Sequence, residues 1–431
     1  MIAALELANA GERVVLYEAK SELGGLATYD CEYGDAFYNL QHVVRHHLGK
    51  AWPTIPTSVV VFPRVPFHVP LSGGLRLLKA MLTPNIQTLR GVSWYASDAD
   101  DAAIRYPFHR DIPVSTVTRY VEMVVEHALR TGRLATSRVP MQSTREYILD
   151  PLRRRLEEMG VEIRFNTPAT SLSPKALDAH TVVSAIPPDC YAKLHDTTGL
   201  YGFAVKKMIK LADESQYPQM CFTLYFKESL EPLSGMDLRE TAWGLRILPN
   251  YSDNAWSGTC TYMHRRDTSG RLAAESSFQQ FKESVIQQIG DCRELVEHFF
   301  DNGIDLVEQL DTLVDFKVNN AWTSETMESP LFMTLDSYKE TWLRPVAGSK
   351  IGARVHVAGA HAGTGCEIWS LESAAEAGKR AAIAVLQSKG KENEASKVFV
   401  DCHERHPLRF AMLGLGLLTA TLSLVFAVLY K

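Results

Sequence analysis

Three residues near the start of the chain have the types and the order of a dinucleotide-binding site. Glu18 ends a strand-like run over residues 13–17, and the adjacent pair Gly24 and Gly25 follows shortly after it. A carboxylate at a strand end offers two acceptor oxygens to the hydroxyls of a ribose. Glycines let the backbone approach a pyrophosphate because they have no Cβ. Glu18 alone could equally be a solvated acid, but together the three residues predict a ribose and pyrophosphate site.

The elements expected around these residues follow the order of a dinucleotide-binding βαβ unit. A short apolar helix over residues 1–10 stops at Gly11, and a strand over residues 13–17 comes next. In such a unit, a first strand and a G-x-G-x-x-G turn come before the helix, and an acid lies about 20 residues beyond the glycines. The chain as given lacks that turn. Either the sequence begins at an internal methionine or the protein is a degenerate relative. We favour the first, because losing a central strand leaves buried N–H and C=O groups unpaired.

A second glycine-rich segment lies towards the other end of the chain. A strand over residues 354–359 runs into a turn that contains Gly359, Gly363 and Gly365, and a helix of small residues follows from Leu371. A helix N-terminus carries free N–H groups and a partial positive charge, which favours an anionic group beside it. The glycines could be ordinary turn residues, but the helix that follows them predicts cofactor contact.

The composition excludes several classes of protein. The chain has 431 residues, 46% hydrophobic and 22% charged, which is typical of a globular protein. Its net charge of −5 provides no positive field, so no nucleic-acid partner is expected. The seven cysteines are scattered without a C-x-x-C pair. Neither a disulfide framework nor a metal site is therefore predicted, and a reducing, cytosol-facing compartment fits best.

The C-terminal residues 410–430 form an uncharged, apolar stretch. As a helix it would be about 31 Å long, enough to cross the hydrocarbon core of a bilayer. A buried core helix is the alternative. Arg405 and Arg409 precede the stretch and only Lys431 follows it, which predicts a single-pass C-terminal anchor with the catalytic domain facing the cytosol. The polar run 387–397 is expected to be a flexible linker.

Taken together, the segments 4–25, 143–168, 181–188 and 355–382 resemble the flavin-dependent amine oxidase and phytoene desaturase-like superfamily. The resemblance covers most of residues 1–388 and implies FAD as the cofactor. It implies that Glu18, Gly24 and Gly25 hold the ribose and pyrophosphate, and that the backbone near Ala169 meets the adenine. It also implies that Leu371 starts the helix whose N-terminus points at the flavin.

The catalytic candidates come from the same resemblance. His42 lies in a sequence similar to the Gly-x-His found near the flavin in desaturase-like members, although Leu40 stands in the place of the glycine. Trp369 is expected either to face the flavin or to belong to the core. Cys366 does not fall in the attachment motif for a covalent flavin, so a buried thiol is expected there.

The predicted fold class is α/β: a Rossmann-type FAD-binding domain built from discontinuous segments, with an inserted α+β substrate domain and a C-terminal transmembrane helix. Two helices are expected at 143–159, where Pro151 should introduce a kink or a split, and at 274–301. The predicted boundaries are 1–60, 136–195 and 349–388 for the FAD-binding domain, 61–135 for a helical cap, 196–348 for the substrate domain, 389–409 for the linker and 410–430 for the transmembrane helix.

Three departures weaken the resemblance: the missing phosphate turn, Leu26 where an arginine is common, and Ala360 and His361 where the family has an acid. The leading hypothesis is a membrane-anchored FAD oxidoreductase that takes a hydride from a C–N or C–C centre of a lipophilic small molecule. The anchor, which would make the lipid bilayer a partner, is the reason to expect such a substrate. A degenerate, non-catalytic binding scaffold is the alternative. A flavin-dependent sugar mutase is a third hypothesis, but the chain shows no basic residues placed to clamp a diphosphate.

Overall fold

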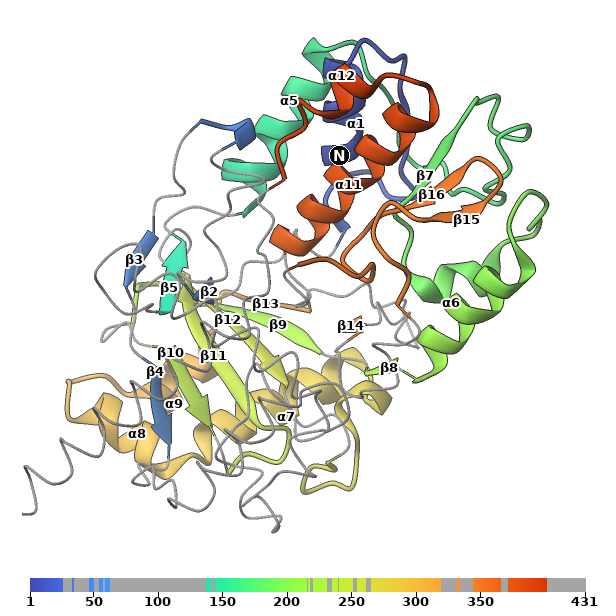
Figure 1. Ribbon diagram of the computed structural model, residues 1–431. Coiled ribbons are helices and arrows are strands. Elements are labelled where there is room, and N and C mark those ends of the chain that lie inside the picture. Colours follow the sequence, from blue (N-terminus) through green and yellow to red (C-terminus); the bar gives the residue numbers. More distant parts are fainter. Residues whose placement is uncertain are drawn as a thin grey trace, which may run out of the picture.

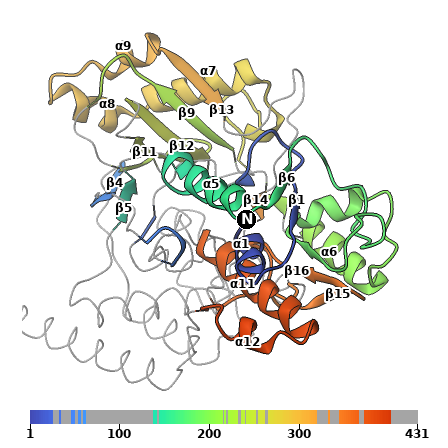
Figure 2. The same ribbon diagram turned by 90° about the horizontal axis from the view of Figure 1, so that it is seen from above.

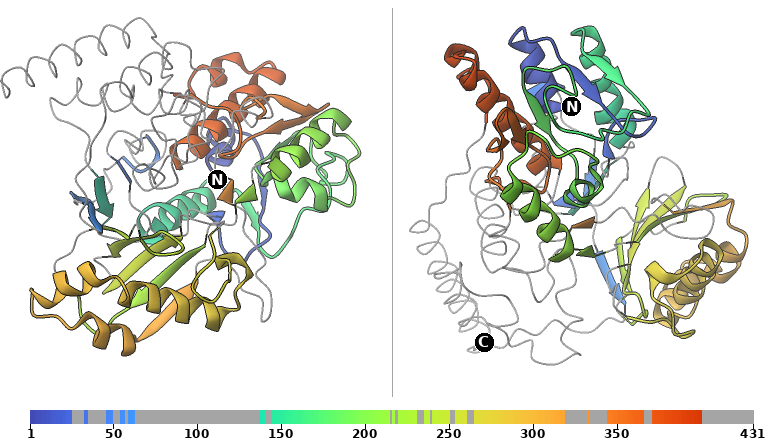
Figure 3. Two further views of the ribbon diagram at one scale, coloured as in Figure 1. Left: turned by 90° about the horizontal axis from the view of Figure 1, so that it is seen from below. Right: turned by 90° about the vertical axis from the view of Figure 1, so that its right-hand side faces the viewer.

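The computed structural model has mixed helices and sheets (Figure 1). It describes residues 1–25, 33–34, 46–49, 54–56, 59–62, 137–140, 144–214, 216–217, 220–230, 235–238, 240–250, 254–260, 265–318, 332–333, 344–365 and 371–400. The predicted helical cap at 61–135 lies almost wholly outside these residues. Two regions lie side by side when the molecule is turned (Figures 2 and 3). We call them the helix-pair region, built around α1 and α11, and the sheet region, built around a six-stranded sheet.

The helix-pair region begins with α1 (Ile2–Asn9), which ends where Gly11 adopts a φ of 76°. β1 (Val15–Tyr17) follows and pairs in parallel with β6 (Glu162–Arg164). Apolar residues of α1, including Ile2 and Leu5, are buried against Leu152 and Leu156 of α5 (Asp150–Glu158). The predicted helix, strand and order of elements at the start of the chain are therefore present.

The predicted helix over 143–159 is divided. A π-helical turn, η5 (Arg145–Leu149), leads into α5 at Asp150. Pro151 lies in the first turn of α5 and has no N–H group to donate to a carbonyl of the preceding helical turn. The kink or split predicted at Pro151 corresponds to this change from π-helical to α-helical winding, and the helical conformation continues across it. Thr144 stands at the N-cap of η5 without a side-chain cap hydrogen bond.

A second small sheet contains β15 (Lys350–Gly352), β16 (Val355–Val357) and β7 (Val182–Ser184), in that order. β16 pairs in parallel with β7 and antiparallel with β15. α6 (Gly202–Glu214) buries Met208 and Leu211 in the same apolar cluster as Val355. The short helix η6 (Pro188–Lys193) follows β7 and packs on α6.

α11 (Leu371–Ser388) packs closely along α1 (Figure 1). A Cβ added at Gly378 would lie 3.1 Å from the backbone nitrogen of Ala3, so this glycine allows the close approach of the two helices. Part of the segment predicted as a linker forms α12 (Glu392–Ala395). Ala395 and Val398 are buried in one cluster with Leu7, so this part of the chain packs on α1 and α11.

The strands of the six-stranded sheet lie side by side in this order: β13 (Asp315–Val318), β9 (Cys221–Tyr225), β12 (Ala255–Cys260), β11 (Leu245–Asn250), β10 (Gly235–Leu238) and β4 (Val59–Phe62). Neighbouring strands are antiparallel except β10 and β4, which are parallel. Two smaller sheets consist of β14 (Phe332–Met333) with β8 (Gln216–Tyr217), and of β2 (Tyr33–Gly34), β5 (Ser137–Pro140) and β3 (Thr54–Pro56).

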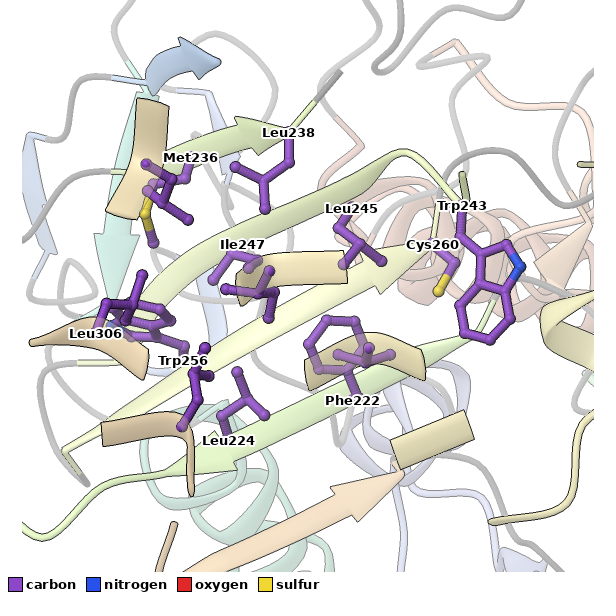
Figure 4. Packing of buried hydrophobic residues seen from close by; sticks show 14 of the residues in the cluster. Phe222, Leu224, Met236, Leu238, Trp243, Leu245, Ile247, Trp256, Cys260 and Leu306 are labelled. Atoms are coloured by element: carbon purple, nitrogen blue, oxygen red, sulfur yellow. The ribbon is translucent and has the colours of Figure 1, made fainter. Parts of the chain in front are cut away.

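Three helices cover one face of the six-stranded sheet: α7 (Phe278–Gly290), α8 (Arg293–Phe300) and α9 (Leu306–Asp311). The predicted single helix over 274–301 is therefore broken between α7 and α8, and the short helix η7 (Ala273–Glu275) precedes α7. Ser277 starts α7 with a capping box that includes Gln280. Alternate residues of the strands, such as Phe222 and Leu224, point into the apolar cluster beneath the helices (Figure 4).

The predicted fold class needs correction in two respects. Among the residues described, the parallel pairs β1–β6 and β7–β16 lie in two separate sheets and not in one Rossmann-type sheet. On its other side, β16 pairs with the antiparallel strand β15. No helix in the described part of the chain is both long enough and apolar enough to cross a bilayer. The predicted transmembrane stretch 410–430 lies outside that part. On this finding the predictions of a transmembrane helix and of a membrane localisation are wrong.

Candidate functional site

Glu18 is held where β1 and β6 end. Its N–H group donates to the carbonyl of Arg164 at 2.9 Å, and its own carbonyl accepts the N–H of Thr167 at 2.9 Å. Its side chain accepts the N–H of Lys20 through Oε1 at 3.0 Å, which forms a local turn. The backbone thus fixes Glu18 beside the segment that leads to the half-buried Ala169, and these two predicted residues follow the paired strands β1 and β6.

The amino group of Met1 lies within the electrostatic reach of Glu18. Burial lowers the pKa of this amine to about 6, and the Glu18 carboxylate partly opposes that shift.

Gly24 and Gly25 both have positive φ values, of 126° and 56°. Such backbone conformations favour glycine. A Cβ at Gly25 would meet no atom within 4 Å, so open space lies beside this residue. Leu23, directly before the pair, is buried in the same cluster as Ile2 and Ala375, with Leu371 packed against it. The Gly-Gly turn, the start of α1 and the first turns of α11 thus contribute to one apolar cluster, and the start of α1 itself lies beside Gly378, seven residues into α11.

The turn after β16 is tightly constrained at Gly359. Its φ is 95°, and a Cβ there would lie 2.9 Å from two atoms of the His361 ring. His361 is buried, and burial, followed by the nearby Arg344 guanidinium, lowers its pKa to about 3. The imidazole is therefore neutral at physiological pH. This turn therefore carries an uncharged, buried ring.

Arg344 binds the backbone of the same turn. Its Nε donates to the carbonyl of His361 at 3.1 Å, and its Nη2 donates to the carbonyls of Ala362 at 2.9 Å and of Ala360 at 3.4 Å. The sequence analysis missed this residue. No local motif signals it, because the contacts join residues 16 to 18 positions apart through a turn whose shape is not readable from residue types.

Glu376 connects the glycine turn to α11. Its Oε1 accepts the N–H of Gly365 at 2.8 Å and the Nε of Arg380 at 2.6 Å. Gly363 donates its N–H to the carbonyl of Pro345 at 2.7 Å. The N–H groups of Gly363 and Gly365 are thus used within the protein, and only the absence of side chains at these positions could favour a cofactor. An acid in the second turn of a helix after a glycine turn was the available sequence signal for Glu376.

Several sequence predictions fall elsewhere. His42 and Trp369, the catalytic candidates, and Cys366 lie outside the described residues. Leu371 begins α11 as predicted and is half-buried against the cluster around Leu5. Glu372, in the first turn of α11, is a buried acid. Its negative charge partly offsets the positive N-terminal end of the helix.

The arrangement combines an acid and an open glycine turn at one end with a turn closed by hydrogen bonds at the other. Glu18 and the space beside Gly25 suit a ribose and an approaching phosphate. The turn at 359–365 is stabilised by Arg344 and Glu376, so it is rigid and can support a planar group without supplying free backbone donors at Gly363 or Gly365.

Comparison with known proteins identifies no family. No family model matches the chain, and no curated protein matches it. The PF1083 protein from Pyrococcus furiosus, a solved structure, matches with a TM-score of 0.50 and 12% identity, covering 94% of this chain and 97% of its own. At that identity the likeness concerns the fold alone.

Two solved structures of 2-methyl-3-hydroxypyridine-5-carboxylic acid oxygenase also align. The tetrameric form has 13% identity and a TM-score of 0.41, with 92% of this chain and 81% of the other covered. A mutant form has 14% identity and a TM-score of 0.39, with 92% and 82% covered. Likenesses this distant carry no argument about function.

Proposed function

We propose that the chain is an FAD-dependent oxidoreductase acting on a small molecule. FAD would bind with its ribose at Glu18, its pyrophosphate at Gly24 and Gly25, and its adenine near Ala169. The flavin would lie towards the turn that contains Gly359 and the start of α11 at Leu371. A bound flavin would supply two-electron chemistry and accept a hydride from a C–N or C–C centre of the substrate.

One observation carries this proposal: three segments far apart in the sequence converge on one place. Leu23 before the glycine pair, Ile2 at the start of α1 and Leu371 at the start of α11 belong to or pack against one buried cluster. These segments therefore share one apolar cluster, and open space lies beside Gly25. An anionic ligand there would be favoured by the N–H donors and partial positive charge of a helix N-terminus, which the buried Glu372 of α11 offsets in part.

The chain's own residues have separate tasks in this proposal. Glu18 would accept hydrogen bonds from ribose hydroxyls, and its backbone hydrogen bonds would keep it in place. Arg344 and Glu376 would hold the turn beneath the flavin through its carbonyls and the Gly365 N–H. The neutral His361 would fill the space beside Gly359 without adding charge. His42 and Trp369 remain the predicted residues near the reacting centre.

The lipophilic substrate expected from the sequence is not part of the proposal, because that expectation depended on the membrane anchor. The substrate is proposed only as a small molecule, and nucleic acid is not proposed as a partner.

Titration of FAD into the purified full chain tests the proposal. We expect saturable binding, seen as a change in flavin fluorescence and competed by ADP, and weaker binding in Glu18→Ala. Glu162→Ala is the matched control, since Glu162 is an exposed acid on the neighbouring strand β6 that pairs with Arg164. Absence of FAD binding to the wild-type chain would refute the proposal, and so would an equal loss of affinity in both variants.

A non-catalytic binding scaffold is the second candidate, and one observation favours it. The N–H groups of Gly363 and Gly365 and the carbonyls of the intervening turn are already bonded to other groups of the protein. A site that had lost its cofactor would be expected to satisfy its polar groups internally. Reduction of the bound flavin by dithionite, followed by reoxidation with oxygen or a quinone, separates the two candidates: a scaffold would bind no flavin to reduce.

A further inference from the structure

A second polar cluster lies between α1 and α11, and none of its members belongs to the predicted cofactor residues. Glu6 projects from α1, Lys379 from α11, and His46 and His47 from the short helical segment at residues 46–47. The side chains of Glu6 and His47 are 6% and 1% exposed, whereas that of His46 is 35% exposed. The cluster is therefore buried on one side and reachable from solvent through His46.

The geometry of the cluster resembles a set of metal ligands. Nε2 of His47 lies 3.4 Å from Oε1 of Glu6, and Nε2 of His46 lies 3.8 Å from the same oxygen. The candidate ligand atoms of all three residues lie within 4.8 Å of one another. Ligands bound to zinc at roughly 2.0–2.2 Å in a tetrahedron are about 3.4 Å apart. One edge already has this length, and small side-chain rotations would close the others.

The buried atoms in the cluster lack hydrogen-bond partners. Oε1 of Glu6 and Nε2 of His47 are both buried, and neither makes a hydrogen bond with adequate geometry in the described part of the chain. Leaving buried polar atoms unsatisfied is unfavourable unless they have another purpose. Both atoms are also the ones that face each other, so a single cation between them would satisfy both.

Lys379 is the competing cation. Its Nζ lies 3.6 Å from Oε1 of Glu6, and it also donates to the carbonyl of Phe399 at 2.8 Å. The carbonyl of Phe399 would keep the Lys379 ammonium in place while a metal ion binds the Glu6 carboxylate. A nearby positive charge and two imidazoles disfavour hard cations such as Mg²⁺ and Ca²⁺, which prefer several oxygen ligands. Imidazole suits Zn²⁺ and other late first-row metals.

We propose that Glu6, His46 and His47 form a binding site for a divalent late first-row metal ion, with Zn²⁺ as the representative ion. The site would have an open fourth position on the exposed side of His46. It would join α1 to the segment at residues 46–49 next to α11, and it is independent of flavin binding.

Isothermal titration of Zn²⁺ into the chelator-treated full chain tests this site. We expect one Zn²⁺ per chain and a rise in the thermal unfolding temperature with Zn²⁺. His46→Gln and His47→Gln should each weaken Zn²⁺ binding by at least about 10- to 100-fold. Loss of a residue that only hydrogen-bonds to a metal ligand already has an effect of this size. His180→Gln, which changes an exposed histidine outside the cluster, should leave binding unchanged.

Two outcomes would overturn the proposal. The wild-type chain could bind no Zn²⁺, or it could bind Zn²⁺ with the same affinity in all the variants, which would indicate an adventitious surface site. If His47→Gln does not fold, His46→Gln decides the question, because its side chain is partly exposed and not needed to fill the core.

Discussion

The sheet region and the helix-pair region bury different kinds of side chain. The cluster under the six-stranded sheet consists of apolar residues such as Phe281, Trp243 and Phe222, which stack or contact one another edge to face. The sheet region also buries two acids, Asp237 in β10 and Asp267. Asp267 accepts hydrogen bonds from Ser284 and two backbone N–H groups, and it lies 3.3 Å from Arg271.

The helix-pair region buries many more ionisable groups among small residues: Glu6, His47, His356, His361, Glu372, Glu376 and Lys379. Burying charge is unfavourable unless it is paired, so a region that retains it is not built for stability alone. The comparison indicates that the sheet region contributes chiefly to stability, and the buried ionisable groups support the ligand binding that we propose for the helix-pair region.

The largest expected effect comes from breaking the buried ion pair. Lys379→Met leaves the Glu6 carboxylate buried without its ammonium and should cost about 3–5 kcal/mol of unfolding free energy, measured in urea. The double variant Glu6→Gln with Lys379→Met should cost less than the single one, because no unpaired charge remains.

Lys389→Met is the control for that experiment. Lys389 pairs with Glu12 near the protein surface and should contribute less than about 1 kcal/mol. Equal costs for Lys379→Met and Lys389→Met would show that the buried charges of the helix-pair region are not coupled as described.

Acid titration of His361 gives the next effect. The pKa of this group falls from 6.5 in the unfolded chain to about 3 in the folded one, so the unfolded state binds more protons between these values. Its contribution is complete above pH 6.5 and is lost as the pH falls. At pH 4.5 the loss should be about 2–3 kcal/mol. His361→Gln should reduce the fall in stability from pH 6.5 to 4.5, and an unchanged pH profile would contradict the burial of a neutral imidazole.

A matched pair of glycine substitutions compares packing in the two regions and has the smallest effect. A Cβ at Gly258 would lie 2.2 Å from the Phe222 ring, and at Gly378 it would lie 3.1 Å from the Ala3 backbone. Gly258→Ala should cost about 1–3 kcal/mol through overpacking. Gly378→Ala should cost less, because roughly 1 kcal/mol of helix propensity offsets the closer contact. The reverse order in thermal unfolding would mean that α1 and α11 pack more rigidly than the sheet core.

Local sequence signals predicted the elements of the helix-pair region well. The apolar helix ended by Gly11, the strand before Glu18 and the split at Pro151 depend on glycine, proline and periodicity, which act within a few residues. The break between α7 and α8 was not predicted, although Gly290 ends α7 and gave a local signal for it, just before Asp291 and Cys292.

The parts that the sequence did not reveal depend on distant contacts. Arg344 reaches the glycine turn from another segment, and no spacing rule connects it to that turn. Glu376 had only a weak signal, its place in the second turn of the helix that follows the glycines. The cluster of Glu6, His46, His47 and Lys379 joins three segments in the same way. The prediction that no metal site exists used cysteine spacing alone, and such spacing cannot detect ligands brought together by the fold.

Hydrogen exchange with and without FAD tests the division between the two regions most directly. FAD should slow amide exchange at the start of α1, around Gly24 and Gly25 and at residues 359–365, and leave strands β9, β11 and β12 unchanged. Protection centred on the six-stranded sheet, or no protection anywhere in the chain, would contradict the account.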